Sequence, residues 1–248
     1  MELIKTLPNL LQKKPKAVIF DTDNTLYPYE PAHQAATEAT EAKACDLLGV
    51  PIEKFEEAFK TARKNVKAQL NQTASSHSRL LYYQRTIELL GMHTQILMTL
   101  DLEQTYWRTF LANCRLFQEV KEFILDLKGV GITTAIITDL TAQIQFRKII
   151  YLGLDSYFDY VVTSEEAGID KPHEAPFKIA LKKLQLAPEN IWMIGDNPDA
   201  DIAGAAKFNM LTLQKKHDGV LIKQQGISVP SYIFENYVEL RKDLIWLK

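Results

Sequence analysis

The chain has 248 residues, of which 46% are hydrophobic and 24% are charged, and its formal net charge is −2. A chain of this length and composition contains enough apolar side chains for a sizeable core. Its nearly neutral charge gives no general attraction to nucleic acid or to an anionic membrane, so we expect neither as a partner. The two cysteines lack the spacing of a metal site or a disulfide framework, and no apolar run approaches a membrane span. We therefore predict a reduced, cytoplasmic protein.

The N-terminal sixteen residues contain a short apolar stretch that Pro8 interrupts, without a signal-peptide cleavage site, and they predict a short helix or arm. Further along, five short runs rich in Val, Ile and Thr predict buried strands. They are Ala17–Phe20, Thr133–Thr138, Tyr160–Thr163, Ile191–Ile194 and Leu211–Leu213. Helical patterns alternate with the last four, at Glu119–Leu127, Ala142–Leu152, Pro176–Leu186 and Asp199–Phe208. This alternation predicts an α/β fold with a doubly wound, Rossmann-like parallel sheet covered on both faces.

A long helical segment separates the first two predicted strands. Four amphipathic helices are predicted there, at Ala32–Leu48, Ile52–Leu70, Arg79–Leu90 and about Thr94–Cys114. A simple crossover between parallel strands needs only one helix. We therefore predict an inserted all-α subdomain at residues 27–116, within a core formed by residues 1–26 and 117–248. Its large apolar residues at helical spacing are expected to form its own core rather than a cofactor site. They are Phe55, Phe59, Met92, Met98, Tyr106, Trp107 and Phe110.

Polar side chains follow each of the first four predicted strands. The four sets are Asp21-Thr22-Asp23-Asn24-Thr25, then Thr138-Asp139, then Lys171-Pro172, and finally Gly195-Asp196-Asn197-Pro198-Asp199-Ala200-Asp201. Ligands of open α/β sheets bind beyond the carboxyl ends of the strands, so we expect these sets to converge on one crevice.

The chemistry of these residues predicts a divalent cation and a phosphate group. Several carboxylates at close quarters repel one another unless a cation joins them. Oxygen ligands suit Mg²⁺, whereas the absence of His and Cys from the four sets disfavours zinc. Lys171 would neutralise a phosphate, and the Thr138 hydroxyl and loop N–H groups would donate hydrogen bonds to its oxygens.

Together the four sets resemble the motifs of the haloacid dehalogenase superfamily of hydrolases. The matching patterns are DxDxT at Asp21–Thr25, a Thr ending the second strand, KP at 171–172 and GDxxxxD ending at Asp201. The helical segment resembles the family's cap, and the resemblance covers essentially the whole chain. Within the superfamily, the chain resembles the phosphatase branch more than the dehalogenases.

The resemblance implies a role for each motif residue. Asp21 resembles the nucleophile that forms an aspartyl-phosphate. Asp23 resembles the general acid–base that protonates the leaving group and then activates water. The implied Mg²⁺ ligands are Asp21, the backbone carbonyl of Asp23, and Asp196. The remaining roles are phosphate binding by Thr138 and Lys171, support of the metal site by Asp201, and bracing of the first loop by Thr25.

Each motif alone is also compatible with a purely structural role. Asp and Thr are common turn residues, and the fourth set is compatible with a loop that ends in a helix N-cap, for which Asp199 is the expected residue. All four sets in order, each after a predicted strand, favour function. One departure lies at Asp139, because the family more often has Asn there. Its side chain would add negative charge if it points into the site, whereas its backbone N–H could still bind phosphate.

Three residues outside the motifs are candidates for substrate specificity. His77 and Arg79 lie between two predicted helices of the insert and suit anions or hydroxyl groups, although an N-cap at Ser76 or Ser78 followed by a solvated Arg is an equal alternative. Tyr27 follows the first motif, and either contacts substrate or packs at the hinge into the insert.

The leading hypothesis is a phosphatase acting on a small metabolite, such as a sugar phosphate, a nucleoside monophosphate or flavin mononucleotide. One alternative is a phosphomutase or a dehalogenase of the same superfamily. Asp23 argues against a dehalogenase, which needs no acid at that position, but a mutase keeps both Asp residues. The other alternative is a catalytically silent binding protein. Catalytically silent members of the superfamily are expected to lack the nucleophile or a metal carboxylate, whereas this chain has both.

Overall fold

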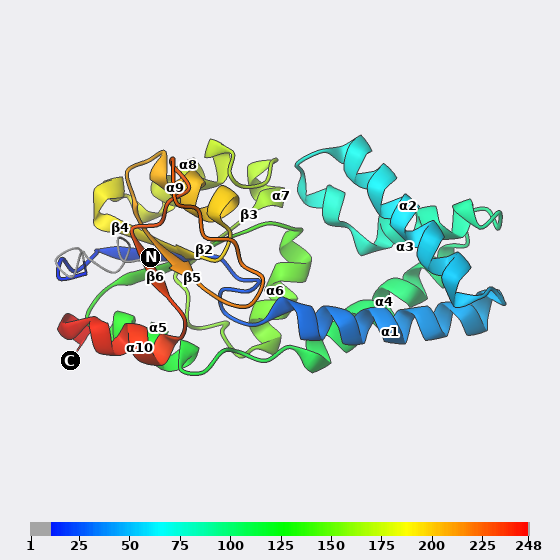
Figure 1. Cartoon of the computed structure of the whole chain (residues 1–248), viewed down its shortest axis with the longest axis horizontal. Coiled ribbons are helices and arrows are strands. Elements are labelled where there is room, and N and C mark those ends of the chain that lie inside the picture. Colours follow the sequence, from blue (N-terminus) through cyan, green and yellow to red (C-terminus); the bar gives the residue numbers. More distant parts are fainter. Residues whose placement is uncertain (1–10, 248) are drawn as a thin grey trace. The chain divides into compact units, whose positions relative to one another are not determined.

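The computed structural model describes residues 11–247, so most of the predicted N-terminal arm lies outside the described residues. The chain divides into two compact units. One unit contains the described residues up to Pro28 and those from Arg115 onward, and the other is Tyr29–Cys114. The first has α/β architecture and the second is helical (Figure 1).

A six-stranded sheet forms the centre of the α/β unit. Its strands are β1 (Ala17–Phe20), β2 (Thr133–Thr138), β3 (Tyr160–Thr163), β4 (Ile191–Gly195), β5 (Leu211–Lys215) and β6 (Tyr232–Phe234). They lie in the order β3-β2-β1-β4-β5-β6, and every neighbouring pair is parallel. The predicted doubly wound parallel fold is confirmed. The strand order reverses between β1 and β4, where ligands of such sheets bind.

Helices cover both faces of this sheet. They are α5 (Val120–Gly129), α6 (Ala142–Tyr151), α7 (Ser164–Ala167), α8 (Glu174–Leu184), α9 (Ala203–Ala206) and α10 (Tyr237–Asp243). Figure 1 shows α5 and α10 on one side of the sheet and α8 and α9 on the other. Successive residues of β1 point to opposite faces, so Ile19 joins the core cluster containing Phe177 of α8, while the ring of Phe20 meets that of Phe123 of α5 at 6.1 Å. Burial on both faces explains why β1 is apolar throughout.

The helical unit contains the four predicted helices. They are α1 (Tyr29–Leu48), α2 (Ile52–Leu70), α3 (Arg79–Leu89) and α4 (Ile96–Asn113), with a short 3₁₀ turn at Ala74–His77. Along α1, small residues are buried every fourth position, and this stripe lets α1 pack closely against α4. The stripe consists of Ala32, Ala36, Thr40 and Ala44. Of the predicted core residues, Phe55, Tyr106, Trp107 and Phe110 are buried, whereas Phe59, Met92 and Met98 are half-buried.

No helix within residues 11–247 has the length and hydrophobicity that crossing a bilayer requires.

Candidate active site

Asp21 follows β1 directly and begins the loop that carries the first motif. Its backbone N–H donates to Ile194 O at 2.9 Å, which fixes the loop start against β4. Asn24 then adopts a left-handed conformation with φ 61°, which Asn tolerates better than most residues. The turn places the Thr25 hydroxyl 3.1 Å from Asp21 Oδ2, to which it donates a hydrogen bond. Thr25 therefore braces the Asp21 carboxylate.

Lys171 holds the other side of this carboxylate. Its Nζ lies 2.6 Å from Asp21 Oδ1, 2.7 Å from Asp201 Oδ1 and 3.0 Å from Ile137 O. The side chain is buried, and these three acceptors use all three ammonium hydrogens. A buried cation with complete hydrogen bonding fixes the two carboxylates in place.

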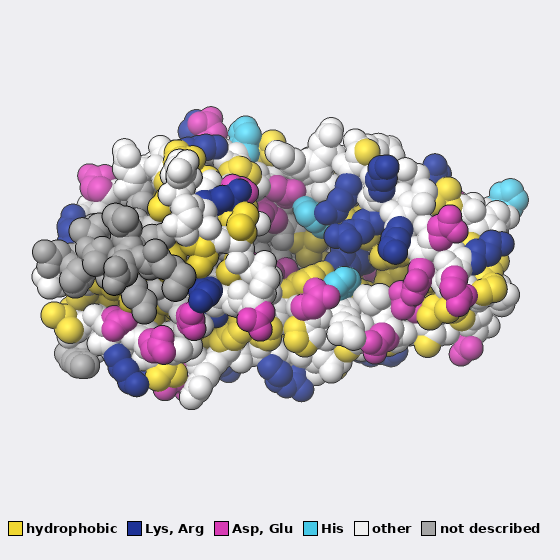
Figure 2. Space-filling view, in the orientation of Figure 1, with side chains coloured by type: hydrophobic (Ala, Val, Ile, Leu, Met, Phe, Trp, Pro, Cys, Tyr) yellow, Lys and Arg dark blue, Asp and Glu magenta, His cyan; other side chains and the backbone are white. Residues whose placement is uncertain are grey.

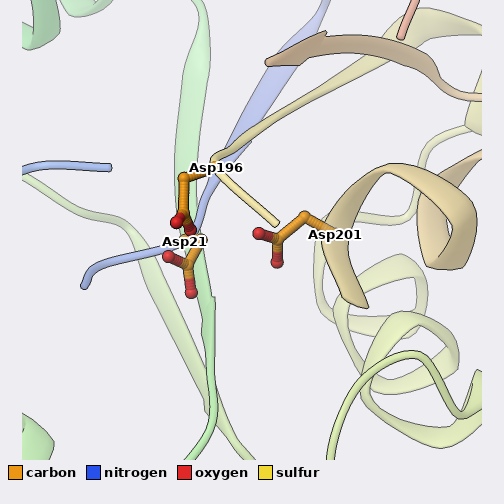
Figure 3. Close-up of side chains that lie close together, drawn as sticks. All are labelled: Asp21, Asp196 and Asp201. Carbon is orange, nitrogen blue, oxygen red and sulfur yellow. The ribbon is translucent and has the colours of Figure 1, made fainter. Parts of the chain in front are cut away.

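Asp21 follows β1, whereas Asp196 and Asp201 belong to the segment after β4, and the three side chains form one cluster. Each offers a carboxylate oxygen, and these oxygens lie within 4.8 Å of one another. Figure 3 shows the three side chains close together, with Asp201 on its helical turn. Gly195 precedes Asp196, and a Cβ there would lie 2.5 Å from the side chain of Asp201, so the close approach of these residues requires glycine.

A short π-helical turn, Pro198–Ile202, positions Asp201. The side-chain oxygen of Asn197 caps this turn by accepting hydrogen bonds from the backbone N–H groups of Asp199 at 2.9 Å and Ala200 at 3.0 Å. The expectation that Asp199 is the cap is therefore wrong, because Asp199 lies within the turn. The Asn197 backbone N–H in addition donates to Asp201 Oδ2 at 3.0 Å.

The carboxylates of the cluster hold protons more tightly than isolated carboxylates do. Burial, with the charges of Asp201 and Asp23, raises the pKa of Asp21 to about 7 against the opposing effect of Lys171. Burial, followed by the charges of Asp21 and Asp201, raises the pKa of Asp196 to about 8. One lysine thus does not balance this acidic cluster. An oxygen-only donor set that still favours positive charge fits a hard divalent cation such as Mg²⁺.

Asp23 is held by a lysine that sequence analysis missed. Lys148 of α6 is buried, and its Nζ lies 2.9 and 3.0 Å from the two Asp23 carboxylate oxygens. The hydroxyl of Tyr27 also donates to Asp23. Burial acts to raise the pKa of Asp23, but the charge and hydrogen bonds of Lys148 and the Tyr27 hydrogen bond outweigh it and lower this pKa. Asp23 is therefore ionised at neutral pH in this arrangement.

The second motif lies beside the first. The Thr138 hydroxyl is buried 2.7 Å from that of Thr22. The Asp139 carboxylate accepts a hydrogen bond from the backbone N–H of Lys171 at 3.0 Å, so this oxygen is used within the loop. Burial raises the pKa of Asp139 to about 6 despite the nearby Lys171 charge.

A histidine that carried no motif also approaches the cluster. His217 Nε2 lies 3.3 Å from Asp196 Oδ2, and no pattern in the surrounding sequence indicated this contact.

The three specificity candidates lie in different units. Tyr27 belongs to the α/β unit and is fully buried beside Asp23. His77 and Arg79 belong to the helical unit. Ser78 caps α3 by accepting from Leu81 N at 3.3 Å, so the alternative of a cap followed by a solvated Arg is met at its cap, whereas Arg79 is half-buried rather than solvated.

Comparison with known proteins supports the resemblance drawn from the motifs. The family model described as haloacid dehalogenase-like hydrolase matches residues 15–209. A ribulose-1,5-bisphosphate 5-phosphatase from Halopiger xanaduensis is 39% identical over 79% of this chain and 83% of its own. A glyceraldehyde 3-phosphate phosphatase from Methanocaldococcus jannaschii is 31% identical over 80% and 84%. The HAD-hydrolase YfnB of Bacillus subtilis, solved with bound magnesium, shares the fold, with a TM-score of 0.68 and 20% identity over 94% of this chain and 100% of its own. The predicted family and enzyme class are confirmed.

Proposed function

We propose that this chain, which belongs to the haloacid dehalogenase-like hydrolases, is a Mg²⁺-dependent phosphatase that cleaves a small sugar phosphate through an aspartyl-phosphate at Asp21. The observation that carries the proposal is the Asp21 carboxylate held between Lys171 and Thr25, in a cluster with Asp196 and Asp201. The related proteins named above act on a sugar bisphosphate and a triose phosphate, which favours this substrate class.

The first step would transfer the phosphoryl group to the enzyme. A carboxylate oxygen of Asp21 attacks phosphorus, a new O–P bond forms, and the bond to the leaving oxygen breaks. Asp23 gives its proton to that oxygen. Although Lys148 and Tyr27 favour the ionised form of Asp23, an arriving phosphate carries like charge and favours the protonated form.

The second step would hydrolyse the intermediate. Asp23, now ionised, accepts a proton from water as that water attacks phosphorus. The Asp21–phosphorus bond breaks, inorganic phosphate leaves, and the Asp21 carboxylate is restored. The Lys148 contacts described above keep Asp23 oriented for both transfers.

Groups around Asp21 would bind the phosphate. Lys171 would attract the phosphate by its charge, whereas the Thr138 hydroxyl and the backbone N–H of Asp139 would donate hydrogen bonds to it. Asp21, Asp196 and the backbone carbonyl of Asp23 would hold Mg²⁺, which supplies positive charge against the phosphate oxygens. Asp201 would support the metal site through its contacts with Lys171 and Asn197.

The helical unit, Tyr29–Cys114, would act as the cap predicted for residues 27–116 and would select the leaving group. A reducing, cytoplasmic location is part of the proposal, because Cys45 and Cys114 are thiols.

A panel of phosphorylated metabolites tests the function. We expect the purified protein with Mg²⁺ to release inorganic phosphate from sugar phosphates with kcat/KM above about 10⁴ M⁻¹s⁻¹, and more slowly from nucleoside monophosphates and flavin mononucleotide. Isomer formation without phosphate release would identify a mutase instead. No turnover of any ester would support a silent binding protein.

Replacing Lys148 tests how Asp23 is positioned. Lys148→Met removes the two hydrogen bonds to the Asp23 carboxylate. Because kcat/KM reports the first transfer, we expect it to fall by about 10-fold to 10²-fold for a sugar phosphate, within the range of general acid catalysis. The loss for 4-nitrophenyl phosphate is expected to be several times smaller, since its leaving group needs little protonation. Lys148→Arg should recover part of the activity.

Lys128→Met is a matched control, because Lys128 lies on the surface of the same unit, where its Nζ is 3.6 Å from Asp159. We expect it to behave like the unmodified protein. Equal losses for both substrates in Lys148→Met would mean that Lys148 supports the fold rather than proton transfer.

A further inference from the structure

Arg79 carries a charge that no described acidic side chain balances. It begins α3 and is half-buried, and its Nε is buried without a hydrogen-bond partner among the described residues. Burial acts to lower the pKa of Arg79, but its interactions with Tyr106, Tyr29 and Tyr82 raise this pKa overall. No described carboxylate pairs with Arg79. Arginine stays charged at physiological pH. A partly desolvated charge without a counter-ion is costly, so this site favours an anion.

The guanidinium of Arg79 is fixed before any ligand binds. Nη2 lies 2.7 Å from the Tyr29 hydroxyl and 3.3 Å from that of Tyr106, while Nη1 donates to His77 O at 3.1 Å. Three aromatic rings lie 4.9–5.8 Å from its central carbon, those of Tyr82, Tyr106 and Trp107. Because these contacts hold the group in place, less conformational entropy would be lost when it binds an oxyanion.

The surroundings of Arg79 are positively charged. Burial, followed by the charges of Arg79 and Arg63, lowers the pKa of His33 to about 4, so this imidazole is neutral at physiological pH. The second half of α2 has four basic residues and no acidic one, at the spacing of one helix face. They are Lys60, Arg63, Lys64 and Lys67. Figure 2 shows Lys and Arg side chains gathered over this part of the helical unit.

We propose that Arg79, with Arg63 and the hydroxyl of Tyr29, forms an anion subsite within the helical unit. It would bind a second oxyanion of the substrate, either a phosphate or a carboxylate group. The substrate class is then a sugar phosphate that carries two anionic groups. This inference rests on the proposed function, because the group that is hydrolysed belongs to the site around Asp21.

Matched substrates test the subsite in the full chain. Hydrolysis is measured for a sugar bisphosphate, a sugar-acid phosphate and a sugar monophosphate of equal length with a neutral end. We expect kcat/KM for one doubly anionic substrate to exceed that for the neutral-ended one by about 10²-fold, the size of a charge-assisted contact. Which of the two is preferred identifies the second group. Arg79→Met should bring this ratio close to one, and Arg79→Lys should leave an intermediate ratio, since lysine keeps the charge but loses the planar fork.

Arg85→Met is the control on the same helix, since Arg85 is exposed and its Nη1 pairs with Glu88 Oε2 at 3.3 Å. We expect it to keep the full preference. Phosphate release without preference for either doubly anionic substrate would overturn the subsite and leave the proposed function intact. The subsite would also be overturned if Arg79→Met and Arg79→Lys kept the same ratio of kcat/KM between doubly anionic and neutral-ended substrates as the unmodified protein. Failure to hydrolyse any ester would instead reject the proposed function.

Discussion

Replacing Asp21 with Asn is expected to lower kcat by at least about 10⁴-fold, as removal of a covalent nucleophile does in other hydrolases. An amide cannot form the aspartyl-phosphate. The substitution keeps the size of the side chain and removes a carboxylate whose pKa burial raises to about 7. Above that pH the carboxylate is ionised in the folded state at a free-energy cost that comes mainly from burial, so we expect the variant to unfold at the same temperature as the unmodified protein or a higher one. Loss of turnover without loss of stability separates chemistry from folding.

Asp23→Asn provides the comparison within the same loop. It keeps the nucleophile and loses proton transfer, so kcat/KM for a sugar phosphate should fall by about 10²-fold to 10⁴-fold. The loss should shrink for 4-nitrophenyl phosphate, whereas Asp21→Asn should inactivate the enzyme toward both esters. Asp155→Asn, at an exposed position, is the control and should not change either rate. Near-normal turnover by Asp21→Asn would rule out Asp21 as the nucleophile.

The central strands were predictable because their sequences are governed by burial. The observed bounds of β1 and β2 equal the predicted ones, since both runs are buried and end at or before a polar residue. Those of the edge strand β3 also equal the prediction, although Tyr160 is exposed, because α7 starts directly after Thr163. In contrast, β6 has three residues and follows Pro230, so it offers no periodicity from which a strand can be predicted. Its position depends on pairing with β5, and the residues next to β6 in the sequence do not reveal this tertiary contact.

The candidate site was predictable where the motif residues lie at strand ends and not where a helix supplies a partner. Lys148 lies on amphipathic α6, where a lysine usually indicates a solvated face. Its burial follows from the Asp23 carboxylate, which only the tertiary structure brings near. The prediction that Asp199 is the N-cap residue of the fourth motif was wrong for a related reason. Both Asn197 and Asp199 are good N-cap residues, and only the backbone path shows that Asn197 faces the N–H groups of the turn.

Removing divalent ions is expected to abolish phosphate release, and adding Mg²⁺ should restore it. The basis is the trio of Asp21, Asp196 and Asp201, whose carboxylate oxygens lie within 4.8 Å of one another. Activity is measured in excess chelator and then after titration with Mg²⁺ or Zn²⁺. Full turnover in chelator would reject the metal requirement. Restoration by Zn²⁺ alone would mean that the oxygen donor set had been assigned to the wrong ion.

The same cluster predicts how stability depends on pH when the metal is removed. The pKa values of Asp21 and Asp196, about 7 and about 8, lie above those of carboxyl groups in an unfolded chain, about 4. The folded state therefore holds more protons, and this contribution to stability is present at low pH and lost as pH rises through about 7 to 8. We expect the thermal unfolding midpoint in chelator to be lower at pH 8.5 than at pH 6.

Mg²⁺ should raise the midpoint at both pH values and more at pH 8.5, because at pH 6 the ion must displace protons that the cluster holds. Asp196→Asn isolates this effect from other titrating groups, since it removes one ligand and one of the two raised pKa values. In that variant, we expect Mg²⁺ to raise the thermal unfolding midpoint by less, and we expect the midpoint in chelator to depend less on pH. A midpoint that does not respond to Mg²⁺ at either pH would show that the three carboxylates do not form a metal site.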